Sequence, residues 1–373
     1  MEKILFVATI DQHIRHFHYP FLKWFKNKGY EVHVASNGEE KLLHVDKKYN
    51  LPLERSPFKK NNILAYRQLK KIIKNNNYKL VHCHTPMGGA ITRLASLAAR
   101  RKGLKVIYTA HGFHFFKGAP KKNWLLYYPI EKVLSRFTDT LITINEEDYN
   151  LAIKKFKVSK IELVNGVGVD LSRFQPQTNQ LKSELRKKLG YKDDDFLVIY
   201  VGELSYRKHQ DTIIKSINLM KEDIPNLKLI LVGEGDYYYR YAKLIESLNL
   251  TNTVQLLGYR TDVLELMLIS DVAVSSSRQE GLPVNVMEAM AVGLPVIVSN
   301  CRGNNDLVKN GLNGFVVNDS PLEFKKHITK LEKNRDLIID IRSKNLEDIN
   351  DLSTQKILSI MSNIYTTEME DIK

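Results

Sequence analysis

Two glutamates, Glu280 and Glu288, stand eight residues apart where a loop runs into an expected helix. An apolar stretch typical of a buried strand precedes this segment, and another follows it. In a parallel α/β sheet such a junction lies at the carboxyl end of a strand, where ligands bind. Gly281 lets the backbone come close to a ligand, and Pro283 suits the first helical turn, because it has no N–H to leave unpaired. The spacing therefore indicates a ligand site.

The chemistry of this junction favours a phosphate flanked by hydroxyl groups. The backbone N–H groups of Val284 and Asn285 would be free at the positive end of a helix, which is an anion site. A carboxylate is repelled by a phosphate, so Glu280 and Glu288 are expected to accept hydrogen bonds from hydroxyl groups on either side of it. A sugar nucleotide offers that order of groups. Spacing alone leaves open a solvated Glu280 and a Glu288 that caps a neighbouring loop.

A second segment carries positive charge that could meet such a phosphate. Gly202, Arg207 and Lys208 follow an expected strand within residues 201–208. Positive charge stabilises the negative charge that grows on a departing phosphate. Arginine can bind phosphate with two donors, whereas lysine acts as a point charge. A solvated surface loop is the alternative that the pattern leaves open.

Histidines and a glycine turn add weaker candidates. Gly233 belongs to a Gly-x-Gly turn after an apolar strand, a pattern that a simple tight turn also gives. His111 ends a strand of the first half, where it could serve chemistry or make a structural hydrogen bond. His82 and His84 would share one face of a strand, but a third and a fourth metal ligand are not apparent. We therefore expect no metal site.

The elements that position these residues alternate between strand and helix. Strands are expected at residues 4–9, 31–35, 80–84, 106–110, 141–144, 161–164, 197–201, 228–232, 254–256, 272–275, 296–299 and 314–317. In the first half, helical patterns occur between them at residues 19–28, 64–74, 89–101 and 124–137. This alternation predicts parallel sheets with right-handed crossovers. The expected fold class is α/β, with two doubly wound Rossmann-like domains facing a central cleft.

Length, linker and charge agree with two unlike domains. A chain of 373 residues is long enough for both, and a Gly/Val-rich turn at residues 165–170 forms a natural linker. The net charge is +14, and residues 1–170 hold 30 basic against 14 acidic residues, whereas residues 171–373 hold 26 against 28. Such asymmetry is typical of proteins that bind nucleic acid or an anionic membrane, yet no nucleic-acid motif is visible.

Cysteine usage and apolar runs bear on location. The two cysteines lie far apart and form no paired framework, which fits a reducing cytosol. The apolar run at the N-terminus is too short for a signal peptide, and no run approaches the roughly 18 residues of a membrane helix. The segment 113–137 combines lysines with aromatic and leucine side chains, which suits either a membrane interface or a core helix. We expect a cytoplasmic protein associated peripherally with the inner face of the membrane.

The segment 277–298, with EGLPVNVME at its centre, resembles the Glu-x7-Glu element of the retaining glycosyltransferases of family 4, which have the GT-B fold. The strings at residues 109–120, 123–129 and 139–145 resemble the subgroup that serves bacterial exopolysaccharide and capsule synthesis. The resemblance covers essentially the whole chain. It implies three parts: an acceptor-side domain at residues 1–170, a donor-binding domain at 171–350, and a C-terminal helix at 351–373 that crosses back to the first domain.

The resemblance also implies roles for single residues. Glu280 would contact the donor sugar and Glu288 the nucleotide ribose. Lys208 matches the lysine on the donor phosphates, and His111 matches a histidine that lies against the donor sugar. The remaining nucleotide-binding positions are Gly202, Gly233, Tyr259, Arg260, Gly281, Leu282, Val284 and Asn285.

The chain departs from the family in two places. The family has an arginine directly after the first glycine of the phosphate loop, where this chain has Glu203, so Arg207 is expected to supply that charge. Many relatives carry a glycine pair in the loop after the first strand, and residues 10–18 contain none. The acceptor residues are therefore not assigned.

The expected function is a retaining hexosyl- or N-acetylhexosaminyltransferase. It would move a sugar from a nucleotide diphosphate donor, UDP-linked by expectation, to a lipid-diphosphate-linked saccharide in exopolysaccharide or capsule synthesis. The resemblance implies no cofactor and no metal, because Arg207, Lys208 and the helix end stabilise the leaving group. Two alternatives are a sugar-nucleotide epimerase of the same fold and a non-enzymatic basic protein that binds membrane or nucleic acid.

Overall fold

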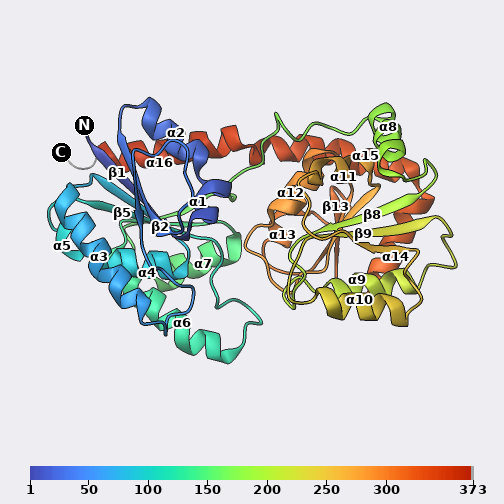
Figure 1. The fold of residues 1–373 in the computed structure, drawn as a ribbon, viewed down its shortest axis with the longest axis horizontal. Coiled ribbons are helices and arrows are strands. Elements are labelled where there is room, and N and C mark those ends of the chain that lie inside the picture. The colour runs from blue at the N-terminus through green and yellow to red at the C-terminus, as the bar shows by residue number, and fades with distance from the viewer. Residues whose placement is uncertain (371–373) are drawn as a thin grey trace. The chain divides into compact units, whose positions relative to one another are not determined.

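The protein consists of two compact α/β units, which we describe separately (Figure 1). The structure is a computed structural model, and it describes residues 1–370 of the chain. Unit 1 comprises Met1–Val167 together with helix α16 (Thr354–Glu370), and unit 2 comprises Gly168–Ser353. The first division thus falls three residues before the expected one at residue 170. The second falls between Ser353 and Thr354, three residues after the expected start of the C-terminal helix.

Unit 1 is built on a parallel seven-stranded sheet in the order β3-β2-β1-β4-β5-β6-β7. Its strands are β1 (Lys3–Ile10), β2 (Glu31–Asn37), β3 (Lys47–Asn50), β4 (Leu80–His84), β5 (Lys105–Ala110), β6 (Thr140–Thr143) and β7 (Lys160–Leu163). The strand order reverses between β1 and β4, so the loops that follow these two strands lie at the topological switch point. Strand β3 was not expected, because its residues, KKYN, contain no apolar run.

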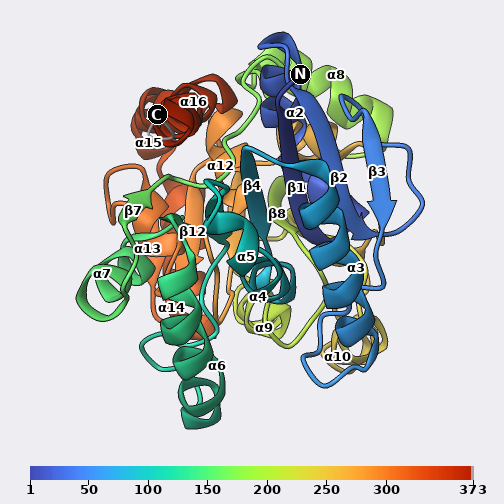
Figure 2. The same ribbon diagram turned by 90° about the vertical axis from the view of Figure 1, so that its left-hand side faces the viewer.

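Helices cover both faces of this sheet (Figures 1 and 2). One face packs against α1 (Asp11–Phe17), α2 (Tyr19–Asn27) and α16. The other face is covered by α3 (Asn61–Asn76), α4 (Pro86–Ala95), α5 (Leu97–Arg100), α6 (Lys121–Leu134) and α7 (Glu146–Lys155), with a short 3-10 turn, η1, at Ser135–Phe137. The buried β-branched and aromatic strand residues are sandwiched between these layers, as a parallel sheet requires.

Unit 2 repeats the plan with six parallel strands in the order β10-β9-β8-β11-β12-β13. They are β8 (Phe196–Val201), β9 (Leu227–Val232), β10 (Val254–Leu256), β11 (Val272–Ser275), β12 (Val296–Ser299) and β13 (Gly314–Val317). All six were expected from the apolar runs, and the expectation of two doubly wound parallel sheets is confirmed. Here the order reverses between β8 and β11, which pair directly.

The helices of unit 2 also form two layers (Figure 1). One layer contains α9 (Gln210–Asn218), α10 (Tyr238–Ser247) and α14 (Pro321–Lys333), whose apolar residues join the main core of the unit. The remaining helical elements are α8 (Asn179–Leu189), α11 (Val263–Ile269), α12 (Val284–Ala291), α13 (Asn304–Leu307), α15 (Arg335–Asp348) and the 3-10 turn η2 (Ile349–Leu352). Helix α12 connects the two strands β11 and β12, as the crossover pattern requires.

Helix α16 is fastened to unit 1 by apolar contacts and by a chain of buried hydrogen bonds that runs from Tyr365 through His82 to Thr109. Ile357, Met361 and Tyr365 are buried in the core that α1 and α2 share. The Tyr365 hydroxyl lies 2.8 Å from Nδ1 of His82 on β4, and the Nε2 atom of the same ring lies 2.8 Å from the Thr109 hydroxyl on β5. The His82 side chain is thus fully engaged in joining the helix to two neighbouring strands.

Replacing Tyr365 by phenylalanine tests this attachment. The change keeps the ring but leaves Nδ1 of the buried His82 without a partner, which costs roughly 1–3 kcal/mol of unfolding free energy. Urea denaturation should show this loss. Tyr239→Phe is a suitable control, because Tyr239 is 80% exposed and should change stability little. Equal midpoints for Tyr365→Phe and the unchanged protein would contradict the assignment.

Candidate functional site

The switch point of unit 2 brings the predicted lysine and glutamate into contact. Lys208 belongs to the loop after β8, and Glu280 belongs to the loop after β11. Because these strands pair in parallel, their carboxyl ends and the loops that follow lie side by side. The Lys208 Nζ donates a hydrogen bond of 2.6 Å to Glu280 Oε1, and Arg207 Nη1 donates one of 3.1 Å to Oε2. One carboxylate therefore bridges two adjacent cations.

Burial makes the charges of this cluster interdependent. The side chains of Lys208 and Glu280 are 9% and 8% exposed, whereas Arg207 is 43% exposed. Burial by itself raises the pKa of Glu280, but the charges of Lys208 and Arg207 outweigh it and hold the pKa below its usual value. The carboxylate is therefore ionised, and the three groups together keep one positive charge. Each carboxylate oxygen still has a lone pair with which to accept a hydroxyl hydrogen.

Glu203, which replaces the expected arginine, also belongs to this neighbourhood. Its carboxylate lies 3.8 Å from Nη2 of Arg207, and both side chains are well exposed. An ion pair at this distance in solvent contributes little stability. Arg207 therefore remains the accessible cation of the loop, with acidic partners on two sides.

The backbone of the Lys208 loop is anchored by strand residues. The buried Tyr200 hydroxyl donates a 2.6 Å hydrogen bond to the Lys208 carbonyl, and the Ser276 hydroxyl donates one of 2.7 Å to the His209 carbonyl. These bonds come from β8 and from the start of the loop after β11. They fix the loop on both sides of the switch point, so the position of Lys208 does not depend on its own ion pair alone.

The glycine turns after β8, β9 and β10 meet one another. The Gly202 N–H donates to the Val232 carbonyl and the Gly233 N–H to the Gly258 carbonyl, each at 2.8 Å. Gly233 has a φ of +141°, and a Cβ atom there would collide with the Gly202 carbonyl. The predicted Gly-x-Gly turn is therefore needed for close backbone approach, which explains Gly202 and Gly233 without a direct ligand contact.

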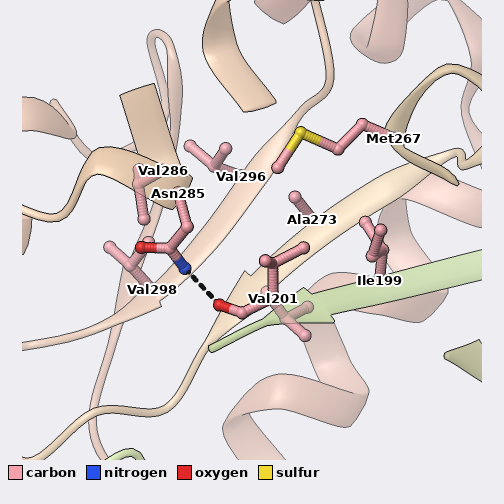
Figure 3. A pocket seen from close by; sticks show the side chains of 9 residues that line it. Ile199, Val201, Met267, Ala273, Asn285, Val286, Val296 and Val298 are labelled. Atoms are coloured by element: carbon pink, nitrogen blue, oxygen red, sulfur yellow. Dashed lines mark hydrogen bonds between the residues drawn. The ribbon is translucent and has the colours of Figure 1, made fainter. Parts of the chain in front are cut away.

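Helix α12 begins one residue later than the sequence indicated. Pro283 is its N-cap and not part of its first turn, and the first intrahelical bonds run from Val286 and Met287 to the Pro283 carbonyl. The N–H groups of Val284 and Asn285 precede these bonds, so they belong to the positive end of the helix. The Asn285 side chain, in contrast, donates a 2.8 Å bond to the Val201 carbonyl (Figure 3). This side chain ties α12 to the end of β8, and the backbone N–H of Asn285 is left to bind a ligand.

Beneath the start of α12 lies a small apolar pocket (Figure 3). Eight apolar side chains and the amide of Asn285 line it; the apolar residues are Ile199, Val201, Met267, Ala273, Val274, Val286, Val296 and Val298. Such a lining suits packing of the helix on the sheet and not a charged ligand. The polar site therefore lies at the strand ends above this packing layer.

Glu288 follows in the second turn of α12. Burial raises its pKa to about 7, and the charge of Arg173 offsets only part of that effect. This glutamate is thus the opposite of Glu280, whose cationic neighbours keep it ionised. A carboxyl group of this kind gains from hydroxyl donors, because hydrogen bonds to the charged form favour ionisation.

The other residues predicted to bind the nucleotide make local contacts or are exposed. Arg260 forms a two-pronged pair with Asp262, with Nε 2.7 Å from Oδ1, and Tyr259 is 70% exposed. Leu282 is buried, and the Gly281 carbonyl lies so close to Gly303 that a side chain there would collide with it. Arg260 is therefore engaged in a local ion pair, and Leu282 and Gly281 shape the loop that carries Glu280.

Arg302 is a site residue that the sequence analysis missed. Its buried guanidinium donates a 3.1 Å bond from Nε to the Glu280 carbonyl. The signal that could have found it is its position shortly after β12, since strand ends on one edge of a parallel sheet converge. Arg302 thereby fixes the backbone of the catalytic candidate Glu280, whose side chain is held by Lys208 and Arg207.

His111 lies in unit 1, directly after β5, among other histidines. Its Nε2 atom is 3.3 Å from Nε2 of His13 and 3.3 Å from Nδ1 of His84. Burial lowers the pKa of His111 to about 4, so the ring is neutral near pH 7. A pocket in unit 1 borders His111 and His13, and its wall includes Arg55, Tyr127 and Ile130.

Comparison with known proteins decides the family. The model for glycosyl transferases group 1 matches residues 182–347, and the model for glycosyl transferase 4-like proteins matches residues 3–145. A putative glycosyltransferase, EpsD, of Bacillus subtilis is 44% identical over 99% of this chain and 97% of its own length. The chain belongs to the family 4-like bacterial polysaccharide glycosyltransferases.

Two further relatives give this glycosyltransferase a chemical and a structural context. An Escherichia coli enzyme named UDP-Gal:alpha-D-GlcNAc-diphosphoundecaprenol alpha-1,3-galactosyltransferase is 33% identical over 80% of this chain and 77% of its own. The crystal structure of Anabaena Alr3699/HepE in complex with UDP and glucose has a TM-score of 0.81, at 21% identity, over 98% of this chain and 100% of that one. The latter likeness shows the GT-B fold that the sequence resemblance implied.

The raised pKa of Glu288 in this glycosyltransferase can be tested through the pH dependence of the free energy of unfolding. A pKa that is raised in the folded protein means that protonation of Glu288 favours folding. The stability that the protonated carboxyl contributes is fully present below the ordinary pKa of about 4.5 and is lost as pH rises through about 7. Ionisation of Glu288 should then cost roughly 3 kcal/mol at pH 8. Glu288→Gln should raise the urea midpoint at pH 8 and leave it nearly unchanged at pH 4. Glu184→Gln, on α8, is the control, and a pH-independent difference for Glu288→Gln would refute the raised pKa.

Proposed function

We propose that the protein is a retaining transferase that moves a sugar from a UDP-linked donor to a lipid-diphosphate-linked saccharide during assembly of a bacterial exopolysaccharide or capsule. The observation that carries the proposal is the buried bridge of Glu280 to Lys208 and Arg207 beside the N-terminus of α12. The named substrates of the Escherichia coli relative, a UDP-sugar and a diphosphoundecaprenol-linked sugar, support the donor and acceptor classes. The relatives offer no comparable support for an epimerase or a non-enzymatic protein.

The donor diphosphate would bind where positive charge and free N–H groups converge. Arg207 and Lys208 supply the charge, and Val284 and Asn285 supply backbone donors at the helix end. Glu280, held in place by the same cations, would accept a hydrogen bond from a hydroxyl of the donor sugar. Glu288 would do the same for the ribose, and its carboxyl would ionise on binding. No metal or cofactor is invoked, because protein groups supply the charge stabilisation.

The reaction would proceed on the face of the sugar that carries the leaving group. The bond from the anomeric carbon to the diphosphate oxygen breaks while the acceptor oxygen forms its bond to the same carbon. The acceptor proton passes to the departing phosphate oxygen, so the configuration is retained without a covalent enzyme intermediate. Arg207 and Lys208 would stabilise the negative charge that grows on the departing diphosphate. Departure of this group is the step that determines the rate in this scheme. Neutral His111 would position the donor sugar by hydrogen bonding.

The acceptor would bind to unit 1, in the pocket beside His111. Tyr127 and Ile130 bring α6 to its wall, and Arg55 provides a cation for a lipid diphosphate. The sequence left this region unassigned. A pocket with mostly apolar walls and a few polar groups is the usual form of a small-molecule site.

The exposed face of α6 would place this pocket at the membrane. Leu125 is 79% exposed, Ile130 43% and Val133 53%, and Lys117, Lys121 and Lys122 are exposed beside them.

The aromatic residues of the segment behave differently: Phe113 and Phe115 are buried, and Trp124, Tyr127 and Tyr128 pack on the core. The core reading of the segment thus holds for its aromatic side chains, and the membrane reading remains our proposal for the exposed ones. Within residues 1–370 no helix combines the length and apolarity needed to cross a bilayer, so contact would be peripheral and, by our proposal, from the cytoplasmic side.

Substitution of the cationic bridge tests the transferase proposal. Lys208→Ala should lower turnover by about 10²–10³-fold, because one preorganised donor to the leaving phosphate is lost. Release of UDP from a panel of UDP-sugars, with lipid extract as acceptor source, gives the measurement. Lys187→Ala, on the solvated face of α8, serves as the matched control. Unchanged turnover in a folded Lys208→Ala protein would remove Lys208 from the mechanism.

The membrane proposal can be tested apart from catalysis. Each lysine near anionic lipid contributes about 1 kcal/mol, so the double change Lys121→Glu/Lys122→Glu should weaken binding to phosphatidylglycerol-containing vesicles at least about 30-fold. Vesicle sedimentation gives the measurement, and Lys187→Glu/Lys188→Glu in unit 2 gives a control with the same change of net charge. Equal weakening by both pairs would show that only net charge matters.

A further inference from the structure

Four histidines of unit 1 converge at the switch point of the seven-stranded sheet. His13 lies on α1, His18 lies between α1 and α2, His84 ends β4, and His111 follows β5. One ring nitrogen from each of them lies within 4.8 Å of the others. The His18 and His84 rings are stacked, with centroids 3.8 Å apart, so one of them must turn before both can direct an in-plane lone pair at a common point. Loops that are distant in the sequence have thus gathered four imidazole groups in one place.

Two separations within the cluster fit a tetrahedral metal ion. Nε2 of His111 is 3.3 Å from a ring nitrogen of His13 and 3.3 Å from one of His84. A zinc ion with Zn–N bonds of about 2.0–2.1 Å places its tetrahedral ligand atoms about 3.3–3.4 Å apart. Two of the distances within the cluster therefore already have the length that a shared ion imposes.

Hydrogen bonding explains the cluster less well. A ring nitrogen offers either one N–H or one lone pair, so Nε2 of His111 can satisfy only one of its two nitrogen neighbours. His18 is fully enclosed, and both of its ring nitrogens lack a hydrogen-bond partner among the described residues. A buried polar group without a partner costs about 1–3 kcal/mol. An ion would give the ring nitrogen of His18 and the crowded Nε2 of His111 a common partner.

The chemistry of the set selects the ion. All four groups are imidazoles, and burial lowers the pKa of each one, which favours the neutral ring that binds metals. The set contains nitrogen and no carboxylate, which suits Zn²⁺ and related transition metals and not Mg²⁺ or Ca²⁺. Four protein ligands complete a tetrahedron, which is the mark of a structural site and not of a catalytic one.

We propose that His13, His18, His84 and His111 bind one Zn²⁺ ion, which fastens the α1–α2 segment to the ends of β4 and β5. The proposal does not depend on the transferase function, and it revises the expectation of no metal site. That expectation considered His82 with His84, but His82 is engaged with Tyr365 and Thr109 and is not part of the set. An ion on Nε2 of His111 would leave its proton on Nδ1, so the ring could still donate a hydrogen bond.

The test uses the full chain without a polyhistidine tag, stripped with a chelator and dialysed. Titration with Co²⁺ should give the intense visible bands of tetrahedral cobalt, saturating at one equivalent per chain, and Zn²⁺ should abolish them. Outer-sphere changes at metal sites weaken binding about 10–100-fold, so loss of a direct ligand in His13→Ala or His18→Gln should weaken it at least about 100-fold. His16→Ala is the matched control, because His16 lies exposed on the same helix and outside the cluster.

Two results would overturn the proposal. One is weak, octahedral-type Co²⁺ absorption in the unchanged protein. The other is equal Co²⁺ affinity in His13→Ala and His16→Ala, which would mean adventitious surface binding. His13 is only partly buried, so His13→Ala is expected to fold. Unfolding curves of His13→Ala and of the unchanged protein, both recorded with chelator, should coincide and thereby separate a lost ligand from a lost fold.

Discussion

The parallel pairing of the first strand of each sheet with two neighbours is the constraint on which both candidate sites depend. In unit 2, β8 lies between β9 and β11, and in unit 1, β1 lies between β2 and β4. The loops that follow β8 and β11, or β1 and β4, therefore start side by side but lead to opposite sides of the sheet. This divergence leaves room at the strand ends, and polar residues gather there in both units. In unit 2, apolar side chains of α12 and of the strands pack against one another beneath these strand ends.

In unit 2 this geometry produces an ion cluster whose members cannot be considered singly. Glu280 is ionised because Lys208 and Arg207 face it, and Lys208 stays in its buried position because Tyr200 and Ser276 hold the backbone around it. Removing one partner from a buried pair leaves an uncompensated charge, which is costly. The cluster is thus both a structural feature and the source of the positive charge for a diphosphate. Glu288, only eight residues away, has no such cationic bridge and is correspondingly hard to ionise.

In unit 1 the same geometry gathers uncharged groups. His13, His18, His84 and His111 lie together, His18 and His84 buried and His13 and His111 partly buried, and His82 lies beside them with other partners. Five histidines within one sheet edge give this unit a nitrogen-rich interior, although its surface carries the excess of lysine and arginine. The histidine-rich interior of unit 1 and the lysine-rich surface of α6 thus have different roles. The histidines organise the loops that follow the strands, and the lysines face an anionic partner in our proposal.

The sequence by itself determined the described strands other than β3, their parallel connections and the family, and it singled out Glu280, Glu288 and Lys208 as candidates. The strands follow from local signals, namely apolar runs of strand length with glycine and proline at turns, whereas the three candidate residues follow from the resemblance to the family. It missed β3, whose polar residues form a strand only because β2 offers an edge to pair with. Only the tertiary structure showed that Glu280 is bound by two cations, that Arg302 holds its backbone, that the Asn285 side chain ties α12 to the end of β8, and that His13 and His18 join His84 and His111. Such facts depend on distances between residues that are far apart in the chain, and these distances are set by strand register and packing, which no local pattern records.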